Sequence, residues 1–320
     1  MTDTTEGTEL AAATLPLRAP AVSPATDALN AQEGLTEKPE SLGRQAWNRF
    51  RRHKLAIIGV GLLFSLAFAF LVGPVFSPYE VGETNVLDNN QGPSLAHPFG
   101  TDPLGRDYFV RAMVGGRFSL LIALVTAICA TAIGLVFGSL AGYFGGVFDI
   151  AVGFVINALL TIPGLLILII YGREVGNNLF LLAIVIAVIS WVRAARLVRA
   201  QVLQLKESEF VLAARAAGAG PVRIITRHLL PNLYGTLLVE ITLLVGAAII
   251  LESTLSFLGL GAQAPLTTLG NLVADNAGAI DTRPSRVLIP GAIITLIILS
   301  INFIGDALRD AVDPKAADES

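Results

Sequence analysis

Residues Ser208–Asn232 read SEFVLAARAAGAGPVRIITRHLLPN, and they form a polar interruption in a chain that is otherwise mostly apolar. We call this stretch the elbow. Its Gly218-Ala-Gly220-Pro221 run predicts a break between two short helices, because glycine ends helices and proline is favoured at a first helical position. Ser208 is expected to cap the first helix, and Glu209 suits its positive end. The elbow therefore predicts a helical projection between two long apolar segments.

The first predicted helix of the elbow is rich in small side chains. A helix of this kind can lie close in a groove of another protein, whereas an ordinary connecting helix does not need such a surface. Arg215, Arg223 and Arg227 add charge on the outer face of the elbow as a whole. The compact residues are Phe210, Val211, Ala213, Ala214, Ala216 and Ala217.

The composition is that of a membrane protein. The chain is 53% hydrophobic and 15% charged, which is far from the balance of a soluble domain. A helix needs about 20 mostly apolar residues to cross a bilayer. We therefore predict an all-α membrane protein with six transmembrane helices. The predicted spans are residues 55–77, 118–141, 148–170, 177–197, 234–257 and 287–307, with an extracytoplasmic segment at 79–117 and a cytoplasmic loop at 200–232 that contains the elbow.

The distribution of basic residues predicts the orientation. With both termini in the cytoplasm, 16 Lys and Arg lie inside and 6 outside, as the positive-inside rule requires. Residues 1–40 hold seven acids and two bases without periodicity, so we expect a disordered tail there. Residues 41–54 predict a basic helix at the inner leaflet, and residues 315–320 a short C-terminal tail. The predicted location is a cell membrane, which the chain crosses several times; the resemblance described below implies that of a bacterium.

Several residues in and near the spans are candidates for packing or function. Gly134, Gly138, Gly142 and Gly146 recur at every fourth position, which allows another helix of this chain, or of a partner subunit, to approach closely. Glu240 and Glu252 lie within the fifth span, where a carboxylate is costly. Glu240 could reach an arginine near the inner face. Glu252 could face a substrate passage or be a satisfied structural acid.

In the outer segment, Asp102 followed by Pro103 predicts the start of a helix. That helix would carry Arg106, Asp107, Arg111 and Arg117 in a wet or interfacial setting. We expect mainly a structural role there, with contact to a substrate or a docking partner as the alternative.

Catalytic and metal-binding patterns are absent from the sequence. Cys129 is the single cysteine, and His53, His97 and His228 lie in separate regions, so no metal site is expected. No G-x-x-x-x-G-K-[ST] phosphate loop occurs, so any ATP and magnesium would be bound by another chain. No cofactor of the chain's own and no nucleic-acid partner are predicted.

The elbow resembles the EAA loop of bacterial ABC importer permeases. That pattern places a glutamate before two alanines, then a glycine, and later I-x-L-P. Ala213, Ala214, Gly218, Leu230 and Pro231 match it, whereas Leu212 stands at the glutamate position and His228 at the isoleucine position. Further segments resemble the C-type permease of dipeptide and oligopeptide importers, in which a tryptophan usually stands where Leu269 is found. They are HPFGTDPLGRD (97–107), AGYFGG (141–146), ARLVRAQ (195–201), LESTLSFLGLG (251–261) and GDALRDAVDP (305–314).

The resemblance implies a non-catalytic permease domain, residues 55–314, with the type I ABC importer architecture. It implies as partners a second permease, two cytoplasmic ATPase subunits and an extracytoplasmic binding protein that delivers peptide. The elbow would be the coupling helix that receives ATPase motion. Alternatives are a related importer of nickel, glutathione or another small solute, and an ion-coupled secondary transporter; no internal repeat favours the latter. A membrane enzyme ranks last.

Overall fold

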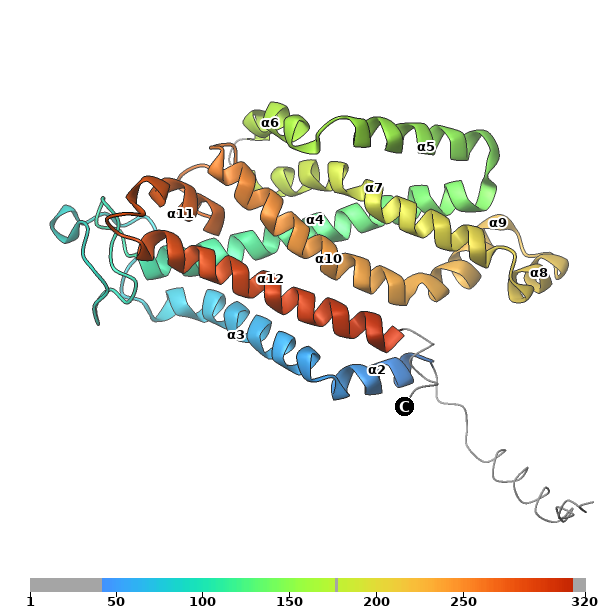
Figure 1. Cartoon of the computed structure of the whole chain (residues 1–320), viewed down its shortest axis with the longest axis horizontal. Coiled ribbons are helices and arrows are strands. Elements are labelled where there is room, and N and C mark those ends of the chain that lie inside the picture. The colour runs from blue at the N-terminus through green and yellow to red at the C-terminus, as the bar shows by residue number, and fades with distance from the viewer. Residues whose placement is uncertain (1–41, 176–177, 313–320) are drawn as a thin grey trace, which may run out of the picture. The chain divides into compact units, whose positions relative to one another are not determined.

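The computed structural model describes residues 42–175 and 178–312, and its regular structure is helical (Figure 1). The described residues from Gln45 onward belong to one compact unit, while residues 42–44 fall in the preceding unit. The predicted tails at 1–40 and 315–320 lie outside the described residues. The α-helices are α2 (Leu42–Arg52), α3 (Lys54–Phe76), α4 (Tyr108–Phe144), α5 (Gly146–Thr161), α6 (Gly164–Val175), α7 (Leu179–Leu205), α8 (Glu209–Ala216), α9 (Pro221–Ile224), α10 (Leu230–Phe257), α11 (Leu269–Asn276) and α12 (Ser285–Val312). Short helical turns lie at Val86–Asp88, Ile225–Leu229 and Ala277–Ala279.

Five helical segments of the described chain are long and apolar enough to cross a membrane. They are α3, α4, α7, α12 and the continuous path Pro221–Phe257 through α9 and α10. The number becomes six if the bent pair α5 and α6 counts as one span. The fold is thus that of an all-α membrane protein. Two of these helices are longer than the spans predicted within them, since α4 begins at Tyr108 and α7 continues to Leu205.

The predicted third span, residues 148–170, is two helices rather than one. α5 ends at Thr161 and α6 starts at Gly164, with a bend of 82° between them. The cause lies in the sequence, because Pro163 disfavours helical backbone at the residue before it. Ile162 accordingly has extended backbone, with φ −89° and ψ 125°.

The core of the unit is the long contact between α4 and α7, which lie side by side in Figure 1. Gly134, Gly138 and Gly142 face α7 along this contact. A Cβ on Gly138 would lie only 2.5 Å from the Ala195 carbonyl oxygen, so the two backbones could not come this close with a larger residue. The glycines therefore serve packing within the chain. Gly146 does not share this role, because it opens α5 with φ +58° and has open space around it.

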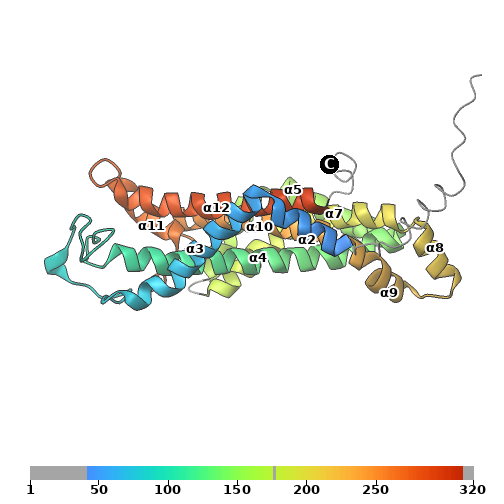
Figure 2. The same cartoon turned by 90° about the horizontal axis from the view of Figure 1, so that it is seen from below.

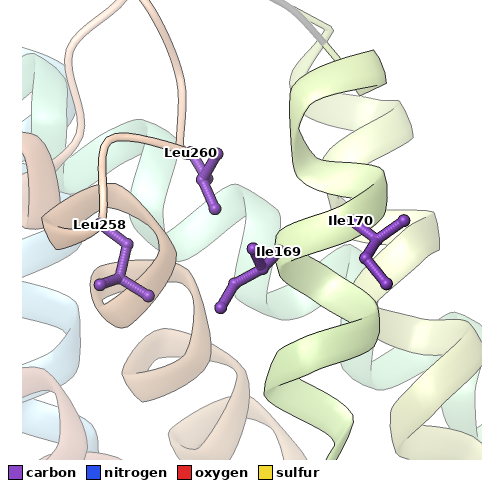
Figure 3. A pocket seen from close by; sticks show the side chains of 4 residues that line it. All are labelled: Ile169, Ile170, Leu258 and Leu260. Atoms are coloured by element: carbon purple, nitrogen blue, oxygen red, sulfur yellow. The ribbon is translucent and has the colours of Figure 1, made fainter.

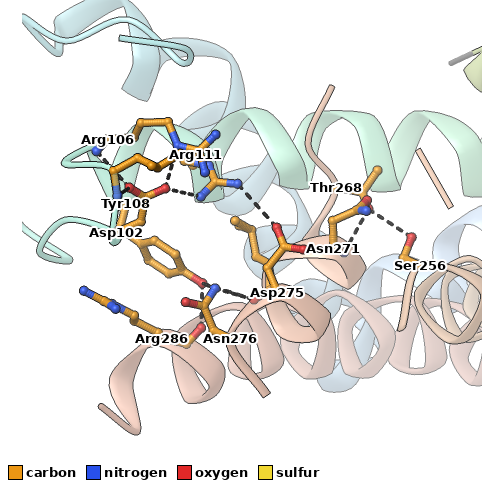
Figure 4. Close-up of polar contacts among 12 residues, drawn as sticks. Asp102, Arg106, Tyr108, Arg111, Ser256, Thr268, Asn271, Asp275, Asn276 and Arg286 are labelled. Carbon is orange, nitrogen blue, oxygen red and sulfur yellow. Dashed lines mark hydrogen bonds and ion pairs between the residues drawn. The ribbon is translucent and has the colours of Figure 1, made fainter. Parts of the chain in front are cut away.

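The α3–α4 segment, residues 77–107, forms the end of the unit opposite α8 (Figure 2). The sequence predicted that a helix begins at Asp102, and this prediction was wrong. The helix α4 starts at Tyr108, and Asp107 caps it by accepting a hydrogen bond from the Val110 N–H at 2.8 Å. The Asp102 side chain instead binds two arginines. It is buried and accepts from Arg106 Nε and Arg111 Nη1, each at 2.6 Å (Figure 4).

These contacts make Asp102 the centre of a buried charged cluster. Burial alone would raise its pKa, but the hydrogen bonds from Arg106 and the charge of Arg111 hold that pKa below its usual value. Arg111 is buried too, and its Nη2 also lies 3.7 Å from Asp275 of α11. Arg111 is therefore not on a wet or interfacial surface, as was expected, whereas Arg117 of the same helix is exposed. A structural role for this segment fits the geometry.

Candidate functional site

The elbow contains a compact turn between α8 and α9. Gly218 has φ +81°, a left-handed conformation that glycine adopts without a steric penalty. Its N–H donates to the Arg215 carbonyl oxygen and the Ala219 N–H to that of Ala214, both at 3.0 Å. This pair of bonds is the Schellman arrangement, which satisfies the last carbonyls of a helix. Pro221 then occupies the first position of α9, as its sequence context predicted.

The helix α8 begins where the sequence predicted, but the Ser208 side chain does not make the predicted capping hydrogen bond. Ser208 is the N-cap residue of α8, yet its side chain accepts no bond from the helix. Its Oγ donates instead to the Leu205 carbonyl oxygen at 2.5 Å. Ser208 therefore ties α8 back to the end of α7. Glu209 occupies the first turn of α8 as expected.

One side of the elbow is anchored in an apolar cluster. Val211 of α8 is completely buried, and it packs with side chains of α7, α9 and α10. The sequence pattern placed Val211 among the compact residues of the first helix and did not predict this anchor. The i, i+4 spacing from residue 225 to 237 could have revealed its partners. The cluster comprises Val198, Val202, Val211, Ile224, Ile225, Leu229, Leu233 and Leu237.

The other side of the elbow is exposed and largely apolar. Phe210 and Leu212 are 41% and 46% exposed, and Val222 beside the turn is 74% exposed. Ala213 and Ala216 are exposed between them, together with the positively charged Arg215. A helix fixed on one side and apolar on the other offers a firm surface for a protein partner.

The elbow's second helix does not stand alone. α9 continues through a π-helical turn, Ile225–Leu229, into α10, whose first residues are Leu230 and Pro231. The Leu230 N–H donates to the Ile225 carbonyl oxygen, five residues back. In a regular α-helix a proline cannot donate to the carbonyl oxygen of residue i−4, and its ring clashes with that carbonyl group. The wider π-helical turn before Pro231 accommodates the proline. The elbow is thereby joined directly to a membrane-crossing helix.

Two acids of α10 are buried in different environments. Glu240 lies 3.2 Å from Arg193 Nε of α7, so the expected arginine contact is present. Glu252 is completely buried. It contacts the hydroxyls of Ser119 and Ser256 at 3.2 and 2.8 Å. Glu252 is therefore enclosed within the unit, with a hydroxyl neighbour at each of its two oxygens.

Asp149 and Arg199 form a further polar contact that sequence reasoning missed. Both Asp149 oxygens accept from Arg199, at 2.5 and 2.6 Å. This two-bond pair joins the start of α5 to α7. The signal in the sequence was an acid within a predicted apolar region, facing a stretch of α7 with arginines at every third position.

A hollow between α6 and the end of α10 is lined by aliphatic side chains (Figure 3). Ile169 and Ile170 come from α6, and Leu258 and Leu260 follow α10. Its volume is about 520 Å³. These side chains offer no charge or hydrogen bond, so they provide no polar selection of a ligand. Within residues 42–175 and 178–312, no group of three His, Cys, Asp or Glu could hold a metal ion.

Comparison with known sequences identifies the family. The family described as "Binding-protein-dependent transport system inner membrane component" matches residues 134–318, more than half of the chain. This chain belongs to that family. Residues 41–93 match a second family, the N-terminal TM domain of oligopeptide transport permease C. The predicted resemblance is thereby confirmed.

Individual permeases resemble this one over most of their length. The oligopeptide transport system permease protein OppC of Bacillus subtilis is 39% identical over 92% of this chain and 96% of its own. The dipeptide transport system permease protein DppC of the same organism is 41% identical over 86% of both chains. A chain of the inward-facing MetNI methionine ABC transporter is 22% identical, with a TM-score of 0.48, over 62% of this chain and 94% of its own.

Membership defines the general role. The protein is a permease subunit, a non-catalytic inner membrane component of a binding-protein-dependent ABC transport system. The helices that cross the membrane belong to this role, and the elbow is the polar helical element that projects between two of them.

Proposed function

We propose that this permease forms half of the passage of an ATP-driven peptide importer and receives ATPase motion through the elbow. The observation that carries the coupling role is the two-sided form of α8. Val211 fixes the helix to α7 and α10, while Phe210 and Leu212 remain exposed for a partner. Motion imposed on α8 would pass through the compact turn at Gly218 into α9, and from there into α10, because α9, the π-helical turn and α10 are continuous.

The remaining parts of the proposal follow from the relatives and from the charge distribution. The relatives named for oligopeptide and dipeptide transport support a peptide cargo. The partners would be a second permease, two ATPase subunits that bind ATP and magnesium, and a substrate-binding protein. The excess of Lys and Arg on the elbow side supports cytoplasmic termini and a cytoplasmic elbow. Gly218, Ala213, Ala214, Leu230 and Pro231 are assigned to the coupling site.

Gly218→Val is the variant that tests the coupling role. The φ of +81° is strained for a β-branched residue, by about 1–3 kcal/mol, so α8 should lose its fixed direction relative to α9. In proteoliposomes that contain the full complex, we expect ATP-dependent peptide uptake to fall at least about tenfold, while membrane insertion remains normal.

Gly220→Ala is the matched control, since it lies two residues away in the same turn. Gly220 has φ −72°, and a Cβ there meets nothing within 4 Å, so uptake should stay near that of the wild type. Undiminished uptake by a well-expressed Gly218→Val protein would contradict the coupling role. Uptake by the wild-type complex in the absence of ATP would contradict the ATP-driven importer itself.

A further inference from the structure

Glu252 sits at the meeting point of α4, α10 and the start of α11. It is completely buried, and its two oxygens have separate hydroxyl neighbours. Ser119 Oγ of α4 donates to Oε2 at 3.2 Å, and Ser256 Oγ lies 2.8 Å from Oε1. In the part of the chain that the structure describes, no ion pair involves Glu252. A charged carboxylate in this place would lack a cation to offset its burial.

A chain of hydrogen bonds runs from Glu252 to the segment before α11. Ser256 Oγ lies 3.3 Å from Thr268 Oγ1, and Thr268 Oγ1 donates to Asn271 Oδ1 at 2.5 Å (Figure 4). Asn271 Nδ2 donates to the Ala262 carbonyl oxygen at 2.8 Å. Since only the nitrogen of the amide can donate, this last bond fixes Asn271 Oδ1 as an acceptor.

Counting the hydroxyl protons shows which group donates in each hydrogen bond of this series. A hydroxyl has a single proton, and that of Thr268 is used on Asn271. The bond between Thr268 and Ser256 must therefore use the Ser256 proton. The contact between Ser256 and Glu252 then needs a proton from the carboxyl group. A protonated Glu252 supplies the one hydrogen that the contacts among Glu252, Ser256, Thr268 and Asn271 otherwise lack.

We infer that Glu252 is a neutral carboxylic acid that donates to Ser256 and thereby positions α11 against α4 and α10. Its Oε1–H group starts the chain of hydrogen bonds that ends at Ala262, and its Oε2 accepts from Ser119. Ser119 Oγ in turn accepts from the Leu269 N–H at 3.1 Å, the first residue of α11. Both oxygens of the acid thus hold the beginning of the same helix.

The surrounding backbone leaves little freedom for another arrangement. A Cβ on Gly270 would lie 2.6 Å from Ser253 Cα, and a Cβ on Gly261 would lie 2.0 Å from Ser256 Oγ. α11 is therefore in direct backbone contact with α10 beside the acid. Farther along α11, Asp275 lies 3.7 Å from Arg111. The position of α11 set by Glu252 thus extends to the charged cluster around Asp102.

Infrared difference spectroscopy of the purified complex tests the protonation directly. The wild type minus Glu252→Gln spectrum is expected to contain the C=O stretching band of a protonated carboxylic acid. Glu240→Gln is the matched control, because Glu240 lies on the same helix but contacts Arg193, and its difference spectrum should contain carboxylate bands instead. Carboxylate bands in the Glu252 difference spectrum would overturn the inference.

Hydrogen exchange tests the positioning role. Glu252→Gln keeps a donor and an acceptor of nearly the same shape, so exchange of the amides in residues 269–276 should match the wild type. Glu252→Ala and Thr268→Val remove links of the chain, and the same amides should exchange at least about tenfold faster. Amides of residues 233–245, at the other end of α10, should remain unchanged. Exchange in Glu252→Gln that is as fast as in Glu252→Ala would contradict the inference.

These outcomes are separate from those of the proposed coupling role. The infrared and exchange measurements need no transport, so a failed uptake assay leaves them valid. If Glu252 only positions α11, Glu252→Gln also restores uptake where Glu252→Ala loses it. Loss of uptake in Glu252→Gln with normal exchange of α11 would show that the acid proton itself is required, and would overturn a purely positioning role.

Discussion

Gly138→Val is expected to prevent α4 and α7 from packing. The amount of folded permease in the membrane should therefore fall strongly. A Cβ at this position would lie 2.5 Å from the Ala195 carbonyl oxygen and 3.0 Å from Val198 Cβ, and the two γ-methyl groups of valine need still more room. Backbone atoms have to move, because no flexible side chain can yield. We expect a loss of about 3 kcal/mol or more. The measurement is the thermal stability and yield of the complex by size-exclusion chromatography in detergent.

Gly153→Val provides the matched control for this variant. Gly153 also lies within a helix, α5, but a Cβ there meets nothing within 4 Å. Both variants have the same helix-propensity cost, so the difference between them isolates the packing. Gly138→Ala should lie between the wild type and Gly138→Val. Equal stability of the two valine variants would contradict the assigned role of the α4–α7 contact.

The membrane-crossing helices were predictable because the apolar runs themselves determine them. Each span needs only length and low charge, and these are local properties of the sequence. The bend between α5 and α6 was missed although its cause is local, since Pro163 was read as part of one apolar run. The full length of α4 depends instead on contacts that are distant in the sequence. α4 extends outward to Tyr108 because its first turn packs against α11 and α12, where the Tyr108 hydroxyl donates to the Arg286 carbonyl oxygen at 2.6 Å.

The turn between the two helices of the elbow was predictable from the sequence, but the packing of the elbow against α7 and α10 was not. Gly218 and Pro221 carry backbone signals that act locally, and both take their expected places in the turn. Val211 is different. Its burial depends on side chains of α7 and α10 that approach it only in the folded protein. The exposed face could be assigned only after the buried face was known.

Asp102 illustrates how tertiary contacts override a local rule. The pair Asp102-Pro103 fits a helix start, but two arginines compete for the same carboxylate. Charge-assisted hydrogen bonds from arginines are stronger than a single capping bond. One of these arginines, Arg111, is nine residues farther along the chain, and no local pattern indicates the contact.

Asp102→Ala is therefore expected to destabilise the permease strongly. The change leaves the buried Arg111 without its 2.6 Å partner and removes the acceptor for the Leu104 and Arg106 N–H groups. Breaking one half of a buried ion pair costs about 3–5 kcal/mol. Thermal unfolding of the complex in lipid nanodiscs measures the loss. Asp275→Ala is the matched control, because Asp275 is 57% exposed and 3.7 Å from the same arginine, and it should cost less than about 1 kcal/mol.

The pH dependence of the same pair of proteins separates charge from shape. The pKa of Asp102 is lowered from 3.8 in the folded protein, so its contribution is fully present above 3.8 and is lost as the pH falls through the lower folded value. The difference in unfolding free energy between the wild type and Asp102→Ala should therefore stay constant as the pH falls to about 3.8. It should become smaller at lower pH. Asp102→Asn, which keeps an acceptor without the charge, should remove the acid-dependent part of this difference. A difference that does not change with pH would show that Asp102 stabilises the α3–α4 segment by packing and neutral hydrogen bonds, and not by its charge.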